Sequence, residues 1–452
     1  MRTCLFVIAA AVALAGCASP PPTVSQRADA LMRDLVQRQR FQGAVVMGQG
    51  GRVEYAAGFG MADVERQVPF TPDTPTDGAS IAKTFTAAAL LMLVGEGRLN
   101  LETPVRELVP QYPHASTRVR HLLAHSAGLF DYEWLDPRVA PGEPRTNASH
   151  LALIARDAPV PNFEPGSAFT YDNVAYDVAA MVIERSTGLR YAEVIAERFS
   201  RPLGLAAFVR PARFADWQGI RTRGYQRTAA GWKDHDAYDL EGFHGGANLY
   251  LSARDLYRWV AGYPGVVGAA AHRAALAPAR LDDGRSTGIS LGSWYVSPDG
   301  QRRYYTGSHN GFFCFGYADE GRNIAMAWVA NDAPPSWLQP ALSRALVAIA
   351  EGREPEALVA PPAADASVDP TGRYRVSGVG EVHVGREGPQ LRVRLRGVDY
   401  QGFPVARGVH YVPGLDAYLR FASVPQGQVA LSWNSVFALV PSTLREGAGA
   451  VR

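Results

Sequence analysis

The order of apolar and polar residues near the start of the chain predicts a helix, a hairpin and a second helix. Residues 28–41 place apolar side chains on one helical face, at spacings of three and four residues. Residues 43–47 and 53–59 have the pattern of two strands joined by a glycine-rich turn. A further helix begins near Ser80 and stops at two closely spaced glycines, Gly95 and Gly97.

The pattern then changes twice along the chain. The middle is helical and rich in loops, strand patterns return over residues 288–329, and a closing helix is predicted at 340–351. Residues 355–370 are rich in alanine and proline, which is typical of a linker. Beyond it, residues 372–441 hold short strands separated by glycine and proline, which predicts a small antiparallel β-domain.

The N-terminal residues have the pattern of a targeting signal. Arg2 precedes an apolar stretch too short to span a bilayer, and the stretch ends in Leu-Ala-Gly before Cys17. This ending resembles a bacterial lipobox, whose cysteine is lipidated; the alternative is an ordinary secretory signal with an incidental cysteine. Ala18 after the cysteine resembles lipoproteins sorted to the outer membrane, and a proline-rich tether follows. We therefore expect lipid anchoring at the outer membrane, facing the periplasm, without a membrane-spanning helix.

Composition narrows the possible partners. The chain has 452 residues, 47% of them hydrophobic, and a formal net charge of +2, which argues against a nucleic acid or another polyanion as partner. Lipidation of Cys17 would leave Cys314 as the single cysteine of the mature chain, so no intrachain disulfide is expected. Cys314 lies in an apolar run and is expected to be a small buried hydrophobe.

A serine and a scarce lysine supply the first candidate chemistry. Only two of the 45 lysines and arginines are lysines, and Lys83 stands three residues after Ser80. Residues i and i+3 share one face of a helix, so the Lys83 amine can reach the Ser80 hydroxyl. Positive potential at the helix N-terminus favours a neutral amine and a developing oxyanion, and the Ser80 amide is free to donate. A neutral Lys83 would be the base that the hydroxyl needs as a nucleophile.

Two later segments complete a pattern. Tyr171-Asp172-Asn173 and His309-Asn310-Gly311 follow Ser80-x-x-Lys83 in that order. Together with segments at 41–46, 58–63 and 119–129, the chain over about residues 28–350 resembles the penicillin-binding-protein-like serine hydrolases related to class C β-lactamases.

The resemblance implies a fold and a set of roles. The implied fold is α/β, an antiparallel sheet flanked by helices plus an all-α subdomain, with a lipocalin-like C-terminal β-domain. Tyr171 would share proton transfer with Lys83, and Asn173 would hydrogen-bond the lysine and the substrate. His309 and Gly311 would take the place of a Lys-Thr-Gly segment, with the Phe312 amide as second oxyanion donor. The expected domains are a signal peptide (1–16), a tether (17–27), a hydrolase domain (28–352), a linker (353–370) and the β-domain (371–452).

Three functions follow from these residues. The first is a serine hydrolase that forms an acyl-enzyme on small esters or D-amino-acid peptides and amides. A β-lactamase is disfavoured because His309, mostly neutral at pH 7, holds a carboxylate less well than lysine. A non-catalytic binding protein of the same fold is disfavoured because Ser80, Lys83 and Tyr171 are all present.

Other residues and motifs suggest alternative roles. Asp172 is expected to point away from the pocket, and Glu164 is expected to belong to a turn rather than to act in deacylation. His244-Gly245-Gly246 is the lesser candidate for the third segment. His121 and His125, four apart, lack the glutamate of a zinc motif, so neither a metal nor another cofactor is expected. Ser80 also half-matches a nucleophile elbow, but no strand precedes it and Lys83 would have no role.

Overall fold

The computed structural model describes residues 21–38, 40–139, 145–210, 217, 219, 221–228, 231–236, 242–360, 367–425 and 428–446. The expected signal peptide and Cys17 lie outside these residues. Within them, no helix is both long and apolar enough to cross a membrane.

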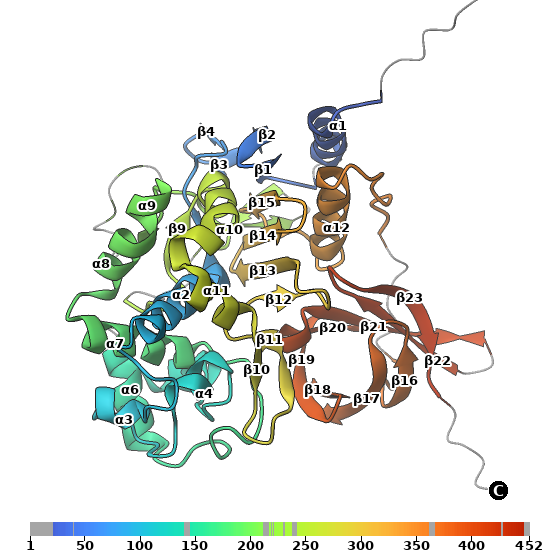
Figure 1. Ribbon diagram of the computed structural model, residues 1–452. Helices are drawn as coiled ribbons and strands as arrows, with labels where there is room; N and C mark the ends of the chain where they lie inside the picture. The colour runs from blue at the N-terminus through green and yellow to red at the C-terminus, as the bar shows by residue number, and fades with distance from the viewer. Residues whose placement is uncertain are drawn as a thin grey trace, which may run out of the picture.

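A six-stranded antiparallel sheet forms the centre of the larger part of the molecule (Figure 1). Its strand order is β12-β13-β14-β15-β1-β2, so strands from the two ends of this part lie side by side. The pairing of β1 with β15 runs from Gly43 opposite Ala330 to Gln49 opposite Ile324. The strands are β1 (Gly43–Gln49), β2 (Arg52–Phe59), β12 (Tyr295–Val296), β13 (Arg302–His309), β14 (Phe312–Asp319) and β15 (Ile324–Ala330).

Helices cover both faces of this sheet. α1 (Val24–Gln37) and α12 (Leu338–Ala350) pack together on one face, and α10 (Ala253–Val267) packs on the other. Strands β14 and β15 are buried along their whole length, because both of their faces are covered. The expected arrangement of an antiparallel sheet flanked by helices is confirmed.

A helical part lies beside α10 and carries the loops that reach the site. The 3₁₀ turn η1 (Ala79–Ile81) leads into α2 (Ala82–Gly95), which is mostly buried and packs against α7 (Val174–Thr187) and α11 (Ala269–Leu276). The remaining helical segments are α3 (Val105–Leu108), α4 (Val119–Leu123), α5 (Tyr132–Leu135), η2 (Asp136–Arg138), α6 (Asn147–Asp157), α8 (Tyr191–Ile195), η3 (Ala196–Ser200) and α9 (Arg201–Leu203).

Short strands connect these layers. β5 (Thr76–Asp77), β9 (Leu249–Leu251) and β6 (Phe208–Val209) form a three-stranded sheet directly before the η1 turn. Three two-stranded sheets pair β3 (Met61–Asp63) with β4 (Val68–Pro69), β7 (Tyr225–Thr228) with β8 (Gly231–Asp234), and β10 (Pro278–Arg280) with β11 (Ser286–Ser290).

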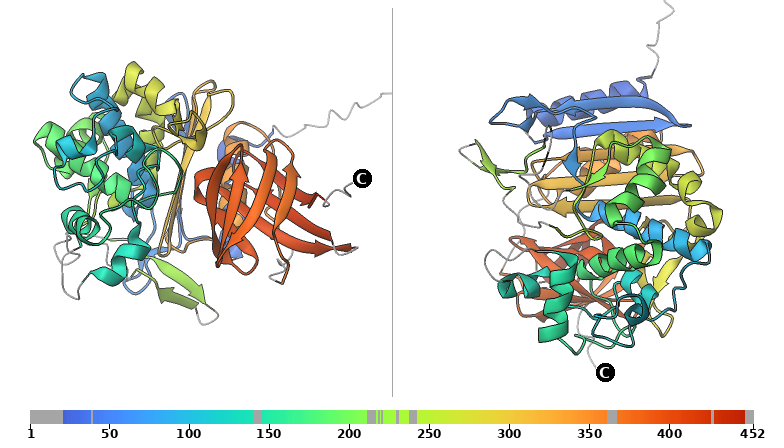
Figure 2. Two further views of the ribbon diagram at one scale, coloured as in Figure 1. Left: turned by 90° about the horizontal axis from the view of Figure 1, so that it is seen from below. Right: turned by 90° about the vertical axis from the view of Figure 1, so that its left-hand side faces the viewer.

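The C-terminal strands form an eight-stranded antiparallel sheet that is nearly closed, and we call it the barrel (Figure 2). Alternate residues of β18 are buried, as the apolar–arginine alternation predicts. A bridge between Tyr374 and Arg445 brings the first and last strands together. The strands are β16 (Gly372–Val376), β17 (Gly380–Glu387), β18 (Gln390–Leu395), β19 (Val398–Ala406), β20 (Val409–Val412), β21 (Ala417–Val424), β22 (Gln428–Asn434) and β23 (Leu439–Leu444), with η5 (Pro413–Leu415) between β20 and β21.

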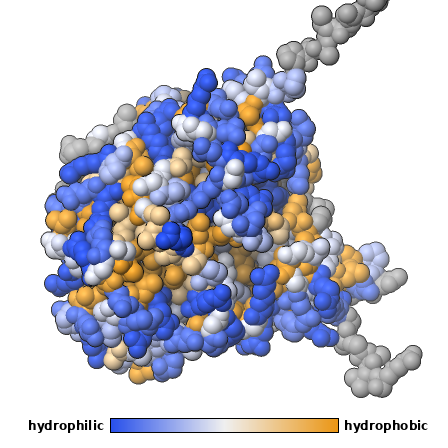
Figure 3. Space-filling model, in the orientation of Figure 1, coloured by the Kyte–Doolittle hydropathy of each residue, from blue (hydrophilic) through white to orange (hydrophobic). Residues whose placement is uncertain are grey.

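The barrel packs against the sheet part near β11, β12 and β13. η5 contacts β11, and the Tyr304 ring of β13 packs edge-on against Phe437 of the barrel. The contact between barrel and sheet is therefore a packed one, and it lies beside the candidate active site. On the face of the molecule shown in Figure 3, polar side chains cover most of the surface and apolar ones lie between them.

Candidate active site

A tight turn presents Ser80 at the start of α2. Ala79 has a φ of +45°, a left-handed conformation that is strained for a residue with a Cβ. The Asp77 carboxylate holds this turn, because its Oδ1 accepts a hydrogen bond from the Ala79 amide at 2.8 Å. Ser80 lies within η1 and is only half-buried. The strained turn therefore directs the hydroxyl into the pocket while its amide stays in the first helical turn.

Lys83 lies one turn later and is completely buried. Its amine hydrogen-bonds Ser80 Oγ at 3.2 Å, Asn173 Oδ1 at 2.7 Å and the Gly246 carbonyl oxygen at 2.9 Å. A neutral amine has two N–H donors and one lone pair. If Asn173 and Gly246 take the two donors, the lone pair faces Ser80 Oγ, which is the arrangement a general base requires.

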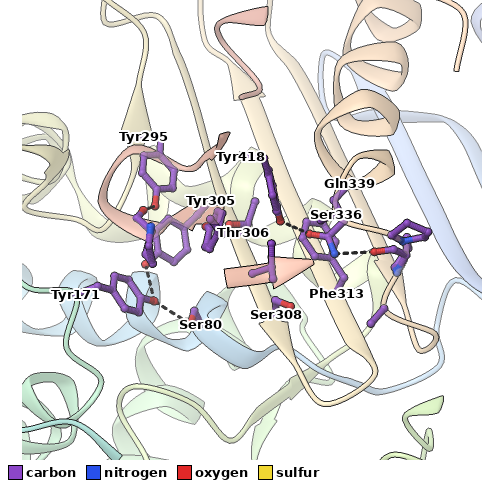
Figure 4. A pocket seen from close by; sticks show the side chains of 16 residues that line it. Ser80, Tyr171, Tyr295, Tyr305, Thr306, Ser308, Phe313, Ser336, Gln339 and Tyr418 are labelled. Atoms are coloured by element: carbon purple, nitrogen blue, oxygen red, sulfur yellow. Dashed lines mark hydrogen bonds between the residues drawn. The ribbon is translucent and has the colours of Figure 1, made fainter. Parts of the chain in front are cut away.

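Tyr171 contacts the same hydroxyl from the other side. Its phenol donates to Ser80 Oγ at 2.9 Å and lies 3.3 Å from the Tyr305 hydroxyl (Figure 4). The Tyr171 ring stacks on the His125 ring, with centroids 4.7 Å apart. The expected group of Ser80, Lys83, Tyr171 and Asn173 is thus brought together from η1, α2 and the loop before α7.

The ionisable groups buried near Lys83 are held in their neutral forms. Burial raises the pKa of the Asp172 carboxyl to about 8, and it raises the pKa of Asp177 well above its ordinary value. Burial, and next the charge of Lys83, lower the pKa of His125 to about 3. Near pH 7 these three groups therefore add little charge to the surroundings of Lys83.

Strand β13 passes directly against the Ser80 turn. A Cβ added at Gly307 would stand 2.3 Å from the Gly78 carbonyl oxygen and 3.1 Å from the Ser80 amide nitrogen. On this edge of β13, β12 pairs only with Arg303 and Tyr304, so the later residues remain open toward Ser80. Only a residue without a side chain fits at position 307, and this close approach places β13 beside the nucleophile.

The direction of the β13 amides follows from the hairpin register. β13 and β14 are joined by a two-residue turn, so His309 and Phe312, which flank it, exchange backbone hydrogen bonds. Hydrogen-bonded pairs alternate along an antiparallel ladder, so Gly307 also faces β14 and the Ser308 N–H points to the open edge. The Ser80 and Ser308 amides are therefore the two donors that geometry offers to an oxyanion.

The structure places His309 against the Asp77 carboxylate rather than among the described residues that line the pocket beside Ser80, which differs from the expected third segment. His309 Nδ1 lies 3.2 Å from Asp77 Oδ2, so its ring faces the carboxylate that holds the nucleophile turn. Asn310 and Gly311 both have positive φ, as in a type I′ hairpin turn, and the buried Phe312 faces His309 across that turn. The Asn-Gly pair between two apolar runs was the sequence signal for this hairpin.

Tyr305-Thr306-Gly307 occupies the position expected of the Lys-Thr-Gly segment. Thr306 and Gly307 supply its last two residues, and Tyr305 stands where a lysine was expected. The Tyr305 hydroxyl reaches Tyr171, and Thr306 lines the pocket. The Thr-Gly pair could have identified this segment from the sequence.

A pocket of about 390 Å³ opens beside Ser80 (Figure 4). None of the described residues that line it carries a charged side chain. Four of them belong to the barrel: Val405, Tyr411, Pro413 and Tyr418. The others are Ser80, Tyr171, Tyr295, Tyr305, Thr306, Ser308, Phe313, Ala333, Pro334, Pro335, Ser336 and Gln339.

A second hollow of about 580 Å³ adjoins the first and shares Ser308, Ala333 and Pro335 with it. It lies at the hairpin end of β13, because Asn310 and Gly311 line it. Unlike the first pocket it has charged walls, among them Arg40 and Arg227. Arg227 donates to the buried Asp332 at 2.9 Å.

The remaining candidate residues have structural contacts. Asp172 is buried and its Oδ1 accepts from the Ala175 amide at 3.0 Å, so it points into the first turn of α7. Glu164 is exposed in a turn closed by the Ser167 amide. His244 stacks on the Tyr191 ring and does not line the pocket. Cys314 is buried on β14.

The two histidines spaced four residues apart, His121 and His125, face different partners. His121 lies 3.1 Å from Asp282, whereas His125 contacts the backbone of Asp172. Among the described residues no group of three or more His, Cys, Asp or Glu side chains could hold a metal ion.

Known proteins resemble this chain over most of its length. A family model described as Beta-lactamase matches residues 28–351. Penicillin-binding protein 4* of Bacillus subtilis is 25% identical over 314 residues, which are 62% of this chain and 65% of that protein. The chain therefore spans just under two thirds of that relative's length.

Two solved structures share the fold. The octameric penicillin-binding protein homologue from Pyrococcus abyssi superposes with a TM-score of 0.60 at 21% identity, covering 93% of this chain and 99% of its own. The D-amino acid amidase from Ochrobactrum anthropi SV3 gives a TM-score of 0.56 at 23% identity, covering 68% and 90%.

Proposed function

The chain belongs to the Beta-lactamase family, and from this premise we propose that it is a serine hydrolase that forms an acyl-enzyme on small esters or D-amino-acid peptides and amides. One observation carries the proposal. Ser80 Oγ is hydrogen-bonded both by Lys83, at 3.2 Å, and by Tyr171, at 2.9 Å. A binding protein would not need a nucleophile held between two proton-transfer groups.

Acylation follows from this geometry. The Lys83 lone pair takes the Ser80 proton while Oγ bonds to the substrate carbonyl carbon. The carbonyl oxygen becomes an oxyanion between the Ser80 and Ser308 amides. Tyr171 then gives its proton to the leaving atom as the bond to the carbonyl carbon breaks, and it regains a proton from Lys83. The products are the free alcohol or amine and the acylated Ser80.

Deacylation uses the same groups in reverse roles. Water attacks the Ser80 ester, Lys83 and Tyr171 take its proton, and that proton returns to Oγ as the acid leaves. Asn173 keeps Lys83 in place, because it accepts from the amine at 2.7 Å and donates to Asp131 at 2.8 Å. Asn173 and Asp131 therefore hold the hydrogen-bond network of Lys83 in position without taking part in the proton transfers themselves.

The alternative function is β-lactam hydrolysis. A β-lactam carries a ring carboxylate, and the pocket beside Ser80 has no charged side chain among its described lining residues. Tyr305 rather than a cation stands at the start of the Thr-Gly segment. The uncharged lining favours esters and amides. The D-amino acid amidase among the fold neighbours supports amides of D-amino acids as one substrate class.

Turnover by the purified protein tests the proposal. We expect hydrolysis of p-nitrophenyl acetate or a D-alanyl anilide, a covalent acyl adduct on Ser80, and loss of both in Ser80→Ala. Equal ester rates in the wild type and in Ser80→Ala would refute the mechanism. Fast hydrolysis of nitrocefin would instead establish the β-lactamase alternative.

A further inference from the structure

One segment of the barrel, residues 411–418, reaches three walls of the pocket beside Ser80. Tyr295 of β12 donates its hydroxyl to the Pro413 carbonyl oxygen. Thr306 of β13 donates to Asp416 Oδ1 at 3.4 Å. Tyr418 donates to the Gln339 side chain (Figure 4). The barrel is therefore attached to the catalytic part at the pocket itself.

The contacts of Gln339 and Asp416 extend this attachment. Gln339 Nε2 donates to the Pro334 carbonyl oxygen at 2.7 Å, in the loop that lines the pocket opposite β13. Asp416 is buried and also accepts from the Tyr411 hydroxyl at 2.8 Å. Through its contacts with Tyr295, Thr306 and Gln339, the segment therefore holds the walls of the pocket in position.

The position of Tyr171 shows which end of a substrate this pocket receives. The leaving atom must lie next to the group that protonates it, so the leaving group extends on the Tyr171 side of Ser80. Tyr171, Tyr305 and Thr306 all line the pocket that the barrel closes. The second hollow lies farther along β13, at Asn310 and Gly311, and is reached past Ser308. The acyl group then extends toward that second hollow.

The lining determines what leaving group fits. The Tyr295, Tyr411 and Tyr418 hydroxyls donate to protein acceptors, so these residues present mainly ring surface to the pocket. A carboxylate would find no cation among the described lining residues, whereas an aromatic or alkyl group would pack against the rings.

On the basis of the proposed acyl-enzyme chemistry, we propose that this pocket is the leaving-group subsite, that it takes an uncharged alcohol or amine, and that Tyr411 and Tyr418 of the barrel set its preference. An amino acid with a free carboxylate is a poor leaving group for this site. The barrel thus acts in substrate selection as well as in stability.

Acetate esters with different leaving groups test this inference in the full-length protein. Phenyl, 2-naphthyl and 4-carboxyphenyl acetate give the same acetyl-enzyme, so differences in kcat/KM report the acylation step alone. We expect the wild type to prefer 2-naphthyl acetate and to discriminate against the carboxylate. Tyr418→Ala should lower kcat/KM for 2-naphthyl acetate about tenfold more than for phenyl acetate, through lost ring contact.

Two further variants separate selection from folding. Tyr305→Lys adds a cation at the Tyr171 side and should raise the kcat/KM ratio of 4-carboxyphenyl to phenyl acetate about tenfold or more. Tyr374→Ala is the matched control, because this buried barrel tyrosine donates to Pro370 and does not line the pocket. It should leave the ratios among the three esters unchanged even if it destabilises the barrel.

Specific outcomes would overturn the inference. Equal effects of Tyr418→Ala and of Tyr374→Ala on all three esters would show that the barrel has only a structural role. If Tyr418→Ala altered the preference among phenyl acetate, butanoate and hexanoate but not among the acetates, the pocket would hold the acyl group instead. Absence of Ser80-dependent turnover of any ester is a different result, and it would refute the proposed function rather than the subsite.

Discussion

Asn173 offers a direct test of how Lys83 is positioned. Its side-chain oxygen accepts from the Lys83 amine at 2.7 Å, and its Nδ2 donates to Asp131 at 2.8 Å. Asn173→Ala removes both contacts and leaves Ser80 and Gly246 as the hydrogen-bond partners of the amine. The amine can then turn away from Ser80, so the variant loses alignment of the base without losing the base itself.

The size of the effect follows from the kind of hydrogen bond removed. A hydrogen bond to a charged group contributes about 1.5–3 kcal/mol, and Lys83 becomes charged once it takes the Ser80 proton. At 1.4 kcal/mol for each factor of ten, kcat/KM should fall by roughly 10- to 150-fold. Ser80→Ala should fall further, because it removes the nucleophile. The assay is steady-state ester hydrolysis across pH 5–9, together with thermal unfolding.

Asn331→Ala provides the matched control. Asn331 is also buried, and its amide donates to the carbonyl oxygens of Met61, Ala62 and Arg223, away from Lys83. It should lose stability but keep kcat/KM within about threefold in the folded fraction. A folded Asn173→Ala with wild-type kcat/KM, or an equal loss in both variants, would refute the positioning argument.

Three further predictions concern the nucleophile turn, pH and the N-terminus. Gly307→Ala should reduce kcat/KM by about 100-fold, because the added Cβ would meet backbone at 2.3 Å beside Ser80. A Cβ added at Gly95 meets nothing within 4 Å, so Gly95→Ala should remain active, and equal activities of the two variants would contradict this prediction. Burial lowers the pKa of His150 to about 3, so below pH 6.5 the unfolded state binds a proton that the folded state does not. In urea unfolding, the free energy of unfolding of His150→Phe relative to that of the wild type should rise by about 1.4 kcal/mol for each pH unit from pH 6 down to pH 4. An identical pH dependence of the two unfolding free energies would exclude this linkage. Finally, radiolabelled palmitate should enter the wild type but not Cys17→Ala, and label in both would reject Cys17 as the lipidated residue.

Much of the architecture could be predicted from local pattern. The helix at the start, the β1–β2 hairpin, α2 after Ser80 and the closing helix α12 each appear where apolar spacing placed them, within a few residues. The proximity of Ser80 and Lys83 was predictable as well, because residues i and i+3 of a helical turn are neighbours in any fold. The buried contact of Asp172 with the start of α7 agrees with the expectation that it points away from the pocket.

The third segment shows where local pattern failed. The histidine of His309-Asn310-Gly311 predicts a site segment, yet the Asn-Gly pair forms the turn between β13 and β14. Strand residues alternate in direction, so the side chain that faces a site depends on register and on which edge of the strand is open. That edge is open to Ser80 only because β12 pairs no farther than Tyr304, which is a fact about two strands and a distant turn.

By itself, the sequence determined the chemistry available to this protein: a serine, a lysine on the same helical face, and a tyrosine and an asparagine placed before a later helix. These depend on short-range geometry, which neighbouring residues dictate. Only the tertiary structure decided that Tyr305 and Ser308 rather than His309 lie beside Ser80, and that barrel tyrosines close the pocket. These residues lie more than 200 positions from Ser80 in the sequence, and their contacts are set by how sheet and barrel pack rather than by any local pattern.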